Sequence, residues 1–231
     1  HNLPGVPTGE LLTRSGIICS SESLFEIKIK GMGGHSSMPQ LGRDAITIGA
    51  EVVQALQTII SRRIASGSGA VVSVTEFISN GQRNVLPGET ILKGDVRTRR
   101  PDDRKKIELF LHQIASGIAS AHDIEIEVSF ETEFIETINH IKPTEAVLKT
   151  AKKSGLKVTD CKPMSFSEDF AHFSNAVPGC FFLLGNGIDG ANNKPLHSSD
   201  YDFNDDLLPI GADFWANLAK NRLSTEGSNS V

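Results

Sequence analysis

The sequence predicts a mixed fold class, with an α+β unit of ferredoxin-like type at residues 24–135 and an α/β part after it. Segments with strand-like and helix-like hydrophobic periods follow one another over this range in the order β-α-β-β-α-β. That order is typical of the split βαβ unit, in which two helices cover one face of a four-stranded sheet. Later in the chain, residues 180–184 form a continuous apolar run, which is typical of a strand buried on both faces of an α/β sheet.

The chain up to residue 62 is predicted to hold one strand and one helix. Residues 1–22 are rich in Gly, Pro and Ser and predict a loop that leads into a short extended segment. Residues 24–30 alternate apolar and charged side chains, which predicts a half-buried strand. A helix is expected over 44–62 with Asp44 as its N-cap. Its expected apolar face consists of Ala45, Ile46, Val52, Val53, Leu56, Ile59 and Ile60.

The rest of the α+β unit is predicted to contain three strands and a second helix. Strands at 70–78 and 89–98 are separated by the turn signals Asn80-Gly81 and Pro87-Gly88. Pro101 and the acids after it open the helix, because Pro suits the first turn and acids suit the positive end of the helix dipole. The last strand covers 124–130, where apolar and polar residues alternate again.

Two further helices are predicted in the α/β part. One covers 143–154 and the other covers 206–223. The inward side chains of the second are expected to be Leu207, Ile210, Phe214, Trp215 and Leu218. The polar tail after Ser224 is expected to fray.

The composition excludes several classes of partner. The 231 residues carry 23 basic and 28 acidic side chains, a formal net charge of −5, so there is no basic excess for nucleic acid or an anionic membrane. No apolar run approaches the roughly 20 residues that span a bilayer. The cysteines Cys19, Cys161 and Cys180 are far apart and are expected to be reduced, which favours a cytoplasmic protein. The chain starts at His1 and not at Met, so the sequence does not test for a leader peptide.

Two histidines stand out by their surroundings. His35 lies in a Gly-Gly-His-Ser-Ser segment directly after a predicted strand, where an imidazole could donate to a developing oxyanion or simply cap the next turn. His197 lies in a loop beyond the predicted core strand, at the end of a sheet where ligands of α/β folds gather. Imidazole is the commonest metal ligand near neutral pH, so His197 could bind a metal. His1 lies next to a tight turn, and on its own it indicates no function.

Three other polar residues have both a functional and a plain structural interpretation. Arg97 could bind a carboxylate through its bidentate donors or could pair with a local acid, and Asn84 lies in the preceding turn region. Glu168 and Asp169 could support a metal site or could serve as helix-capping acids.

Taken together, the motifs resemble the dinuclear-metal aminoacylase and carboxypeptidase family, in particular its hippurate hydrolase and auxin-conjugate (indole-acetyl-amino-acid) hydrolase branch. The resemblance covers nearly the whole chain, and no single string decides it. The matching strings are His1-Asn2-x-Pro4-Gly5, Gly33-Gly34-His35-Ser36-Ser37-Met38-Pro39, Asn84-Val85-Leu86-Pro87, Val96-Arg97-Thr98, Ser167-Glu168-Asp169-Phe170, Val177-Pro178-Gly179, Leu196-His197-Ser198 and Asp202-Phe203-Asn204-Asp205.

The resemblance implies a zinc-peptidase-like α/β catalytic domain that is interrupted by a lid, or dimerisation, domain. The catalytic part would comprise residues 1–22 and 138–231, and the lid residues 23–137. A homodimer through the lid is implied. The implied activity is metal-dependent hydrolysis of the amide bond in N-acyl amino acids, with two divalent ions, Zn or Mn, as cofactors.

The resemblance also implies a role for each matching residue. His1 and His197 match metal ligands, and Glu168 matches a position that supports the metal site. His35 matches the lid histidine that reaches the partner subunit's site and polarises the scissile carbonyl. Asn84 and Arg97 match substrate-binding residues, with Arg97 on the free carboxylate.

The chain also departs from the family pattern. The family's Cys-x-His pair, its further glutamate ligand and its catalytic glutamate have no counterpart after His1. The expectation is therefore a C-terminal portion of an amidohydrolase that is inactive alone. Two alternatives stay open: a non-catalytic dimerisation or binding module derived from the family, and a ferredoxin-like sensor of small molecules that would not use His1 and His197.

Overall fold

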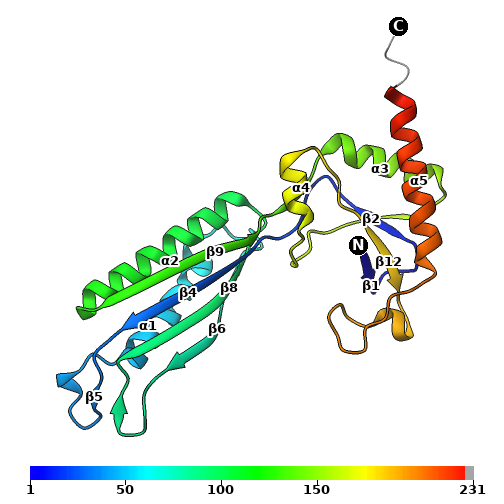
Figure 1. The fold of residues 1–231 in the computed structure, drawn as a ribbon. Coiled ribbons are helices and arrows are strands. Elements are labelled where there is room, and N and C mark those ends of the chain that lie inside the picture. Colours follow the sequence, from blue (N-terminus) through cyan, green and yellow to red (C-terminus); the bar gives the residue numbers. More distant parts are fainter. Residues whose placement is uncertain (227–231) are drawn as a thin grey trace. The chain divides into compact units, whose positions relative to one another are not determined.

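The computed structural model describes residues 1–226, and the chain divides into two compact units (Figure 1). Unit 2 comprises Cys19–Glu136 together with the short segment Ser165–Glu168. Unit 1 comprises His1–Ile18, Thr137–Met164 and the chain from Asp169 onward. The sequence interpretation set the boundaries after residues 22 and 137, and it did not foresee that Ser165–Glu168 belongs with unit 2.

Unit 2 is built on a four-stranded antiparallel sheet. Its strands, in chain order, are β4 (Glu22–Lys30), β6 (Val71–Ser79), β8 (Glu89–Arg97) and β9 (Glu125–Phe134). In space the order is β6-β8-β4-β9, so the first and third strands of the unit are central. With the helices described next, this is the predicted ferredoxin-like βαββαβ arrangement.

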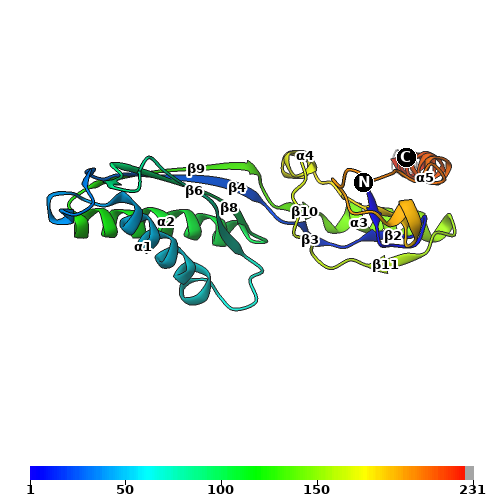
Figure 2. The same ribbon diagram turned by 90° about the horizontal axis from the view of Figure 1, so that it is seen from below.

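Two helices, α1 (Ala45–Thr58) and α2 (Pro101–His122), cover the same face of this sheet (Figure 2). Asp44 caps α1, because its carboxylate accepts a hydrogen bond from the Ile46 backbone N–H at 3.0 Å. Ile46 itself was predicted to face the core but is exposed, since Ala45, Gly49 and Val52 take the inward positions. The helix ends in a π-helical turn, Ile59–Arg63.

The core of unit 2 lies between the helices and the sheet. Its largest fully buried side chains are Ile27, Ile29, Leu56, Ile59, Leu92, Ile107 and Leu111. Gly94 in β8 is required by this packing: a Cβ there would lie 2.2 Å from Phe25 Cζ and 2.2 Å from the Ser73 carbonyl oxygen. The ring of Phe25 on the neighbouring strand therefore fills the space that any side chain at position 94 would need.

Unit 1 contains a mixed sheet whose strands are short. They are β1 (Asn2–Pro4), β12 (Leu183–Gly187), β2 (Leu11–Thr13) and β11 (Val158–Asp160), in that spatial order. β1 runs parallel to β12 and β11 parallel to β2, while β12 and β2 are antiparallel. A separate pair joins β3 (Gly16–Cys19) to β10 (Thr137–Asn139).

Two sequence predictions in unit 1 need correction. Residues 1–22 were expected to form a loop with one short extended segment, but they include all of β1, β2 and β3. The apolar run 180–184 was expected to be a strand; β12 instead starts at Leu183 and continues to Gly187. Every residue of β12 is buried, as the apolar run had indicated.

Three helices complete unit 1: α3 (Ile141–Lys153), α4 (Phe170–Ala176) and α5 (Leu207–Glu226). α3 and α5 pack together on the sheet. The ring of Phe182 lies against those of Phe214 and Trp215, with distances of 5.0 and 5.1 Å between ring centroids. Most of the tail that was expected to fray, 227–231, lies outside the described residues. Among the described helices, none combines the length and hydropathy that crossing a membrane requires.

Candidate active site

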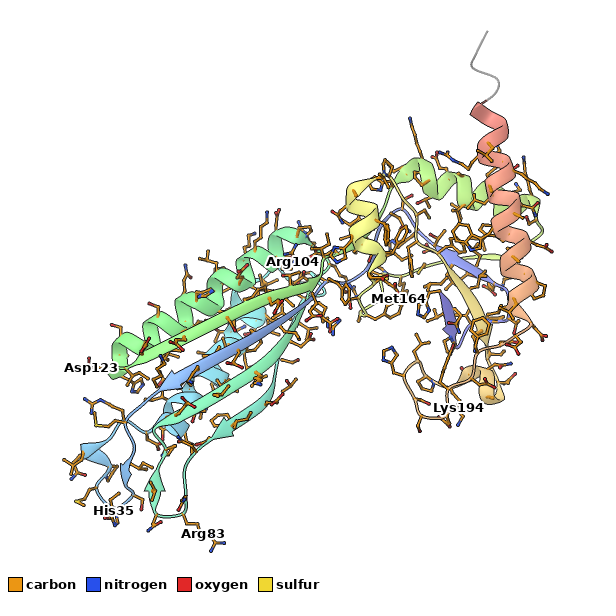
Figure 3. The ribbon with its side chains drawn as sticks, viewed as in Figure 1. His35, Arg83, Arg104, Asp123, Met164 and Lys194 are labelled. Carbon is orange, nitrogen blue, oxygen red and sulfur yellow. The ribbon has the colours of Figure 1, made fainter. Side chains whose placement is uncertain are left out.

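His35 lies at one end of unit 2, on a short strand of its own. This strand, β5 (Gly34–His35), pairs antiparallel with β7 (Val85–Leu86), and His35 lies opposite Val85. Figure 3 shows His35 near Arg83 at this end of the unit, with Arg104 at the opposite end. The segment needs Gly33, because a Cβ there would lie 2.9 Å from the Leu86 carbonyl oxygen. Gly33 therefore lets the two short strands approach closely, whereas a Cβ on Gly34 would meet nothing within 4 Å.

The hydrogen bonds of His35 determine which ring nitrogen carries the proton. The Ser37 backbone N–H donates to His35 Nδ1 at 3.1 Å, so Nδ1 acts as an acceptor and holds no proton. The Ser37 hydroxyl lies 2.8 Å from the same nitrogen. In the neutral ring the proton is then on Nε2, and the side chain is exposed. His35 is thus an oriented hydrogen-bond donor, which is what stabilising an oxyanion requires.

Asn84 is brought close to His35 by the same pairing. Its carbonyl oxygen accepts a hydrogen bond from the Ser36 N–H at 3.2 Å, and its side chain is exposed. The two sequence-predicted residues are 49 positions apart in the chain, and the β5–β7 pair joins them.

Arg97 lies at the other end of unit 2. It is the last residue of β8, a strand of nine residues that begins beside the β5–β7 end, and such a strand is about 27 Å long. Its guanidinium is held by two carboxylates, Glu22 at 2.6 Å and Asp95 at 2.9 Å. Within a single copy of unit 2, therefore, Arg97 is not close to His35.

Ser167 and Glu168 belong to the Arg97 end of unit 2. The Ser167 hydroxyl donates to Glu22 at 2.7 Å, and Arg97 Nη1 donates to the same hydroxyl at 3.3 Å. Glu168 is half-buried beside it in the chain. Sequence reasoning missed Glu22 and Ser167 as partners of Arg97, because nothing in the spacing of residues 22, 97 and 167 indicates that they meet.

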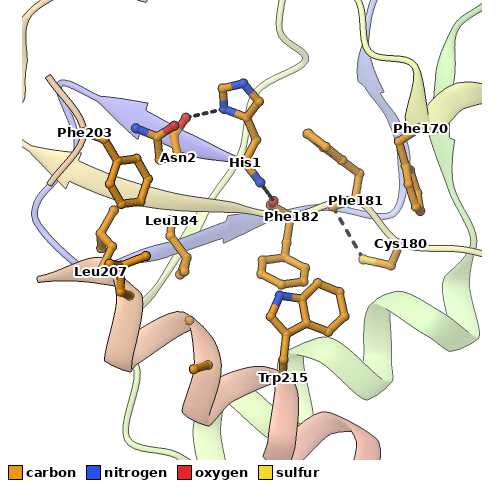
Figure 4. A pocket seen from close by; sticks show the side chains of 13 residues that line it. His1, Asn2, Phe170, Cys180, Phe181, Phe182, Leu184, Phe203, Leu207 and Trp215 are labelled. Carbon is orange, nitrogen blue, oxygen red and sulfur yellow. Dashed lines mark hydrogen bonds between the residues drawn. The ribbon is translucent and has the colours of Figure 1, made fainter. Parts of the chain in front are cut away.

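His1 lies in unit 1, on a cavity of about 460 Å³ with a largely apolar lining (Figure 4). The cavity is bounded by Phe170, Phe181, Phe182, Phe203 and Trp215 among others. His1 Nδ1 lies 2.6 Å from the Asn2 carbonyl oxygen and must donate to it, so the lone pair of the neutral ring is on Nε2. That is the protonation state in which imidazole binds a metal ion.

Cys180 also lines this cavity and sits in a different electrostatic setting. Burial raises the pKa of its thiol, which therefore stays protonated near neutral pH. Its sulfur lies 3.4 Å from the Thr13 hydroxyl. Cys180 thus contributes an uncharged lining atom.

His197 lies in the loop after β12, in a conformation that non-glycine residues adopt rarely, with φ of +66°. Its side chain is exposed. An ion pair of Lys194 with Asp200 at 2.7 Å and a hydrogen bond from Ser198 to Asp200 brace the loop on both sides of it. The bond from Lys194 keeps the pKa of Asp200 below its usual value, so this brace is charged near neutral pH.

A buried asparagine holds this loop to β1. Asn186, which is fully buried, accepts hydrogen bonds from the Asn2 side chain and from the Asn204 N–H, both at 3.0 Å. Its amide donates to the carbonyl oxygens of Asn192 and Asp202 at 2.8 and 3.2 Å. The Asn2 and Asn204 positions of the sequence motifs thus share one partner, and sequence reasoning did not identify Asn186.

The predicted metal ligands do not form a complete metal centre. In the described part of the chain, residues 1–226, no group of three or more His, Cys, Asp and Glu side chains is placed to hold a metal ion. His1 and His197 are both in unit 1, whereas Glu168 is in unit 2. A dinuclear site needs more donors than these two imidazoles supply.

Comparison with known proteins identifies the unit that carries His35. The family model of the peptidase dimerisation domain, M20 type, matches residues 23–123. The chain is 30% identical over 97% of its length to N-acetyldiaminopimelate deacetylase of Leuconostoc mesenteroides. It is 32% identical over 95% of its length to hippurate hydrolase of Campylobacter jejuni. Residues 23–123 belong to the M20 peptidase dimerisation-domain family.

Solved structures agree with the M20 fold. A protein from methicillin-resistant Staphylococcus aureus superposes with a TM-score of 0.88 at 28% identity, over 95% of this chain and 57% of that one. The Bacillus subtilis YxeP protein, a dinuclear metal-binding M20 peptidase, gives 0.79 at 24% identity, over 97% and 56%. The chain spans 58% and 57% of the two enzymes named above, so it corresponds to little more than half of each.

Proposed function

We propose that this chain is the C-terminal part of a metal-dependent amidohydrolase that cleaves the amide bond of N-acyl amino acids. The observation that carries the proposal is His35, a donor oriented by Ser37 and exposed at the end of a domain of the dimerisation type. The named activities of two relatives, deacetylation of an N-acetyl amino acid and hydrolysis of hippurate, support the same reaction class.

In this proposal the two ends of unit 2 serve different active sites of a homodimer. His35 Nε2–H would donate to the carbonyl oxygen of a substrate bound by the partner subunit, where negative charge develops as water adds to the amide carbon. Asn84, from the same end, would help to hold that substrate. Arg97 would bind the free carboxylate in its own subunit, through guanidinium hydrogens that Glu22, Asp95 and Ser167 leave over.

The metal site is proposed to be shared with sequence outside these 231 residues. His1 and His197 would supply two imidazole ligands, and Glu168 would support the site. The two divalent ions, Zn or Mn, would need further ligands such as the Cys-x-His pair and glutamates of the family pattern. The 231-residue chain alone is therefore proposed to be inactive.

The first test compares the 231-residue chain with a longer protein that supplies those ligands. The longer protein with Zn or Mn is expected to release glycine from N-benzoylglycine, and the 231-residue chain is expected to release none. N-benzoylglycinamide, which lacks the carboxylate for Arg97, should be a poorer substrate by a factor of about ten or more. Hydrolysis by the 231-residue chain, or none by the longer protein, would contradict the proposal.

A second candidate, a non-catalytic dimerisation module, is favoured by one observation: the family match itself covers residues 23–123 and no residue of unit 1. The same assay separates the two candidates. A longer protein that forms dimers, binds no divalent metal and hydrolyses no N-acyl amino acid would support the module.

The surface proposed for the homodimer contact is the β6 edge of the sheet. β6 exposes Val71, Phe77 and Ile78, which are 46%, 43% and 46% accessible, and a single charged residue, Glu76. The opposite edge, β9, presents Glu125, Glu127, Glu131 and Glu133 to solvent. Charges on an edge strand discourage pairing with another chain, so β6 is the edge better suited to a second copy.

Ile78→Lys should shift the 231-residue chain from dimer to monomer, because it places a charge in the proposed contact. Light scattering coupled to size-exclusion chromatography measures the change. Ser129→Lys, on the exposed side of β9, is the matched control and should leave the dimer intact. A monomeric wild-type chain, or equal dissociation by both substitutions, would argue against this interface.

A further inference from the structure

A polar cavity lies in unit 2, where the end of α1 meets the start of α2. It has a volume of about 510 Å³, and its charged lining consists of Arg62, Arg63, Arg100, Lys106, Asp102 and Asp103. We call it the basic cavity. Four cations against two acids give it a positive balance in a chain whose formal net charge is −5. The proposed amide hydrolysis does not use it.

The fold places the cations there by two local features. The π-helical turn Ile59–Arg63 ends α1 and brings Arg62 and Arg63 to the rim. Arg63 is fixed by the Phe110 ring, 5.0 Å from its guanidinium, and by the Gln113 side chain at 3.3 Å. Arg100 precedes the first turn of α2, whose backbone dipole adds positive potential at the same place.

Asp103 is the unusual member of the cavity. It is 5% exposed, and its Oδ2 has no hydrogen-bond partner among the described residues. Arg100 Nε lies 4.0 Å from that oxygen, close enough for an ion pair but beyond hydrogen-bonding distance. A buried carboxylate oxygen without a donor is costly, so this position is suited to a ligand that brings a donor of its own.

We propose that the basic cavity binds a protonated oxyanion: hydrogen phosphate or a phosphate monoester. The arginines and Lys106 would receive the anionic oxygens, and Asp103 would accept the P–O–H hydrogen bond. Sulfate has a similar size and charge but carries no proton near neutral pH, so the carboxylate of Asp103 would repel it. The cavity is thereby selective for phosphate over sulfate.

The test is calorimetric titration of the 231-residue chain with inorganic phosphate and with sulfate at pH 7 and matched ionic strength. Phosphate is expected to bind at least about tenfold more tightly than sulfate, the size of effect that one hydrogen bond to a charged group gives. Methyl phosphate, titrated at pH 5 and pH 8, distinguishes a monoester site from one for free phosphate. It should bind at pH 5, where it keeps its proton, and should bind like sulfate at pH 8.

Two variants assign the effect to the cavity. Asp103→Asn offers an amide donor, so the preference for phosphate should fall to within about threefold. Arg62→Ser combined with Arg100→Ser should weaken phosphate binding about tenfold or more, whereas Arg83→Ser, at the His35 end of the unit, should not. Circular dichroism confirms folding of each variant. Equal binding of phosphate and sulfate by the wild-type chain would mean an adventitious ion only, and it would overturn the proposal without any variant. Variants that bind phosphate and sulfate as the wild type does would overturn it as well.

Discussion

Replacing Gly94 by alanine is expected to destabilise unit 2 by about 3 kcal/mol, at the upper end of the range for overpacking a core. The added Cβ would meet Phe25 Cζ and the Ser73 carbonyl oxygen, each at 2.2 Å, where real Cβ contacts are absent. The ring could move only by displacing its core neighbours. The carbonyl oxygen belongs to the backbone of the adjacent strand β6 and can move only with that strand.

Urea unfolding monitored by circular dichroism measures this loss. The matched control is Gly117→Ala on the exposed side of α2, where a Cβ would meet nothing within 4 Å. Alanine favours a helix more than glycine does, so the control should gain about 0.5–1 kcal/mol. A loss below about 0.5 kcal/mol for Gly94→Ala would show that the sheet can open at this position more easily than its packing implies.

In the longer protein proposed above, replacing His35 by alanine is expected to lower kcat for an N-acyl amino acid about 10²–10³-fold, the usual effect of removing one oxyanion donor. The effect should fall on kcat because the hydrogen bond strengthens as charge develops on the carbonyl oxygen. Steady-state kinetics measure it. His112→Ala, an exposed histidine on α2 away from the β5–β7 pair, is the control and should leave kcat unchanged.

Mixing two impaired variants tests whether His35 serves the partner's site. If His35 and Arg97 of one subunit belong to different sites, a heterodimer of His35→Ala and Arg97→Ala chains contains one intact site. Random reassociation of equal amounts should then restore about a quarter of the wild-type activity. No recovery would place both residues in the same site and refute the assignment to two sites.

The sequence predicted those strands and helices whose hydrophobic period repeats over enough residues to be recognised. β4, β8 and β9 each alternate over nine or ten residues, and α2 keeps one apolar stripe over 22. β1, β2 and β3 have three or four residues each, too few for a period of two to be recognised. Their pairing is decided by partners far along the chain, as β1 shows with β12.

The candidate site was predictable as residue types but not as geometry. The sequence showed the histidine and its glycines, and only the structure shows that Gly33 lies against Leu86 of β7. The proton position on His35 depends on Ser37, and the setting of Arg97 depends on Glu22 and Ser167. Such contacts depend on side-chain directions that no spacing rule contains.

The three asparagines Asn2, Asn186 and Asn204 have a consequence for which changes this protein can accept over evolution. Asn186 uses both the donor and the acceptor of its side-chain amide. Aspartate would lack the donor and leucine would lack both, so either replacement would leave buried groups unpaired. The neighbouring residues Ile188 and Asp189 are exposed and take no part in this network. Insertions and substitutions should therefore accumulate there, while the anchor points on either side of the histidine-bearing loop stay constant.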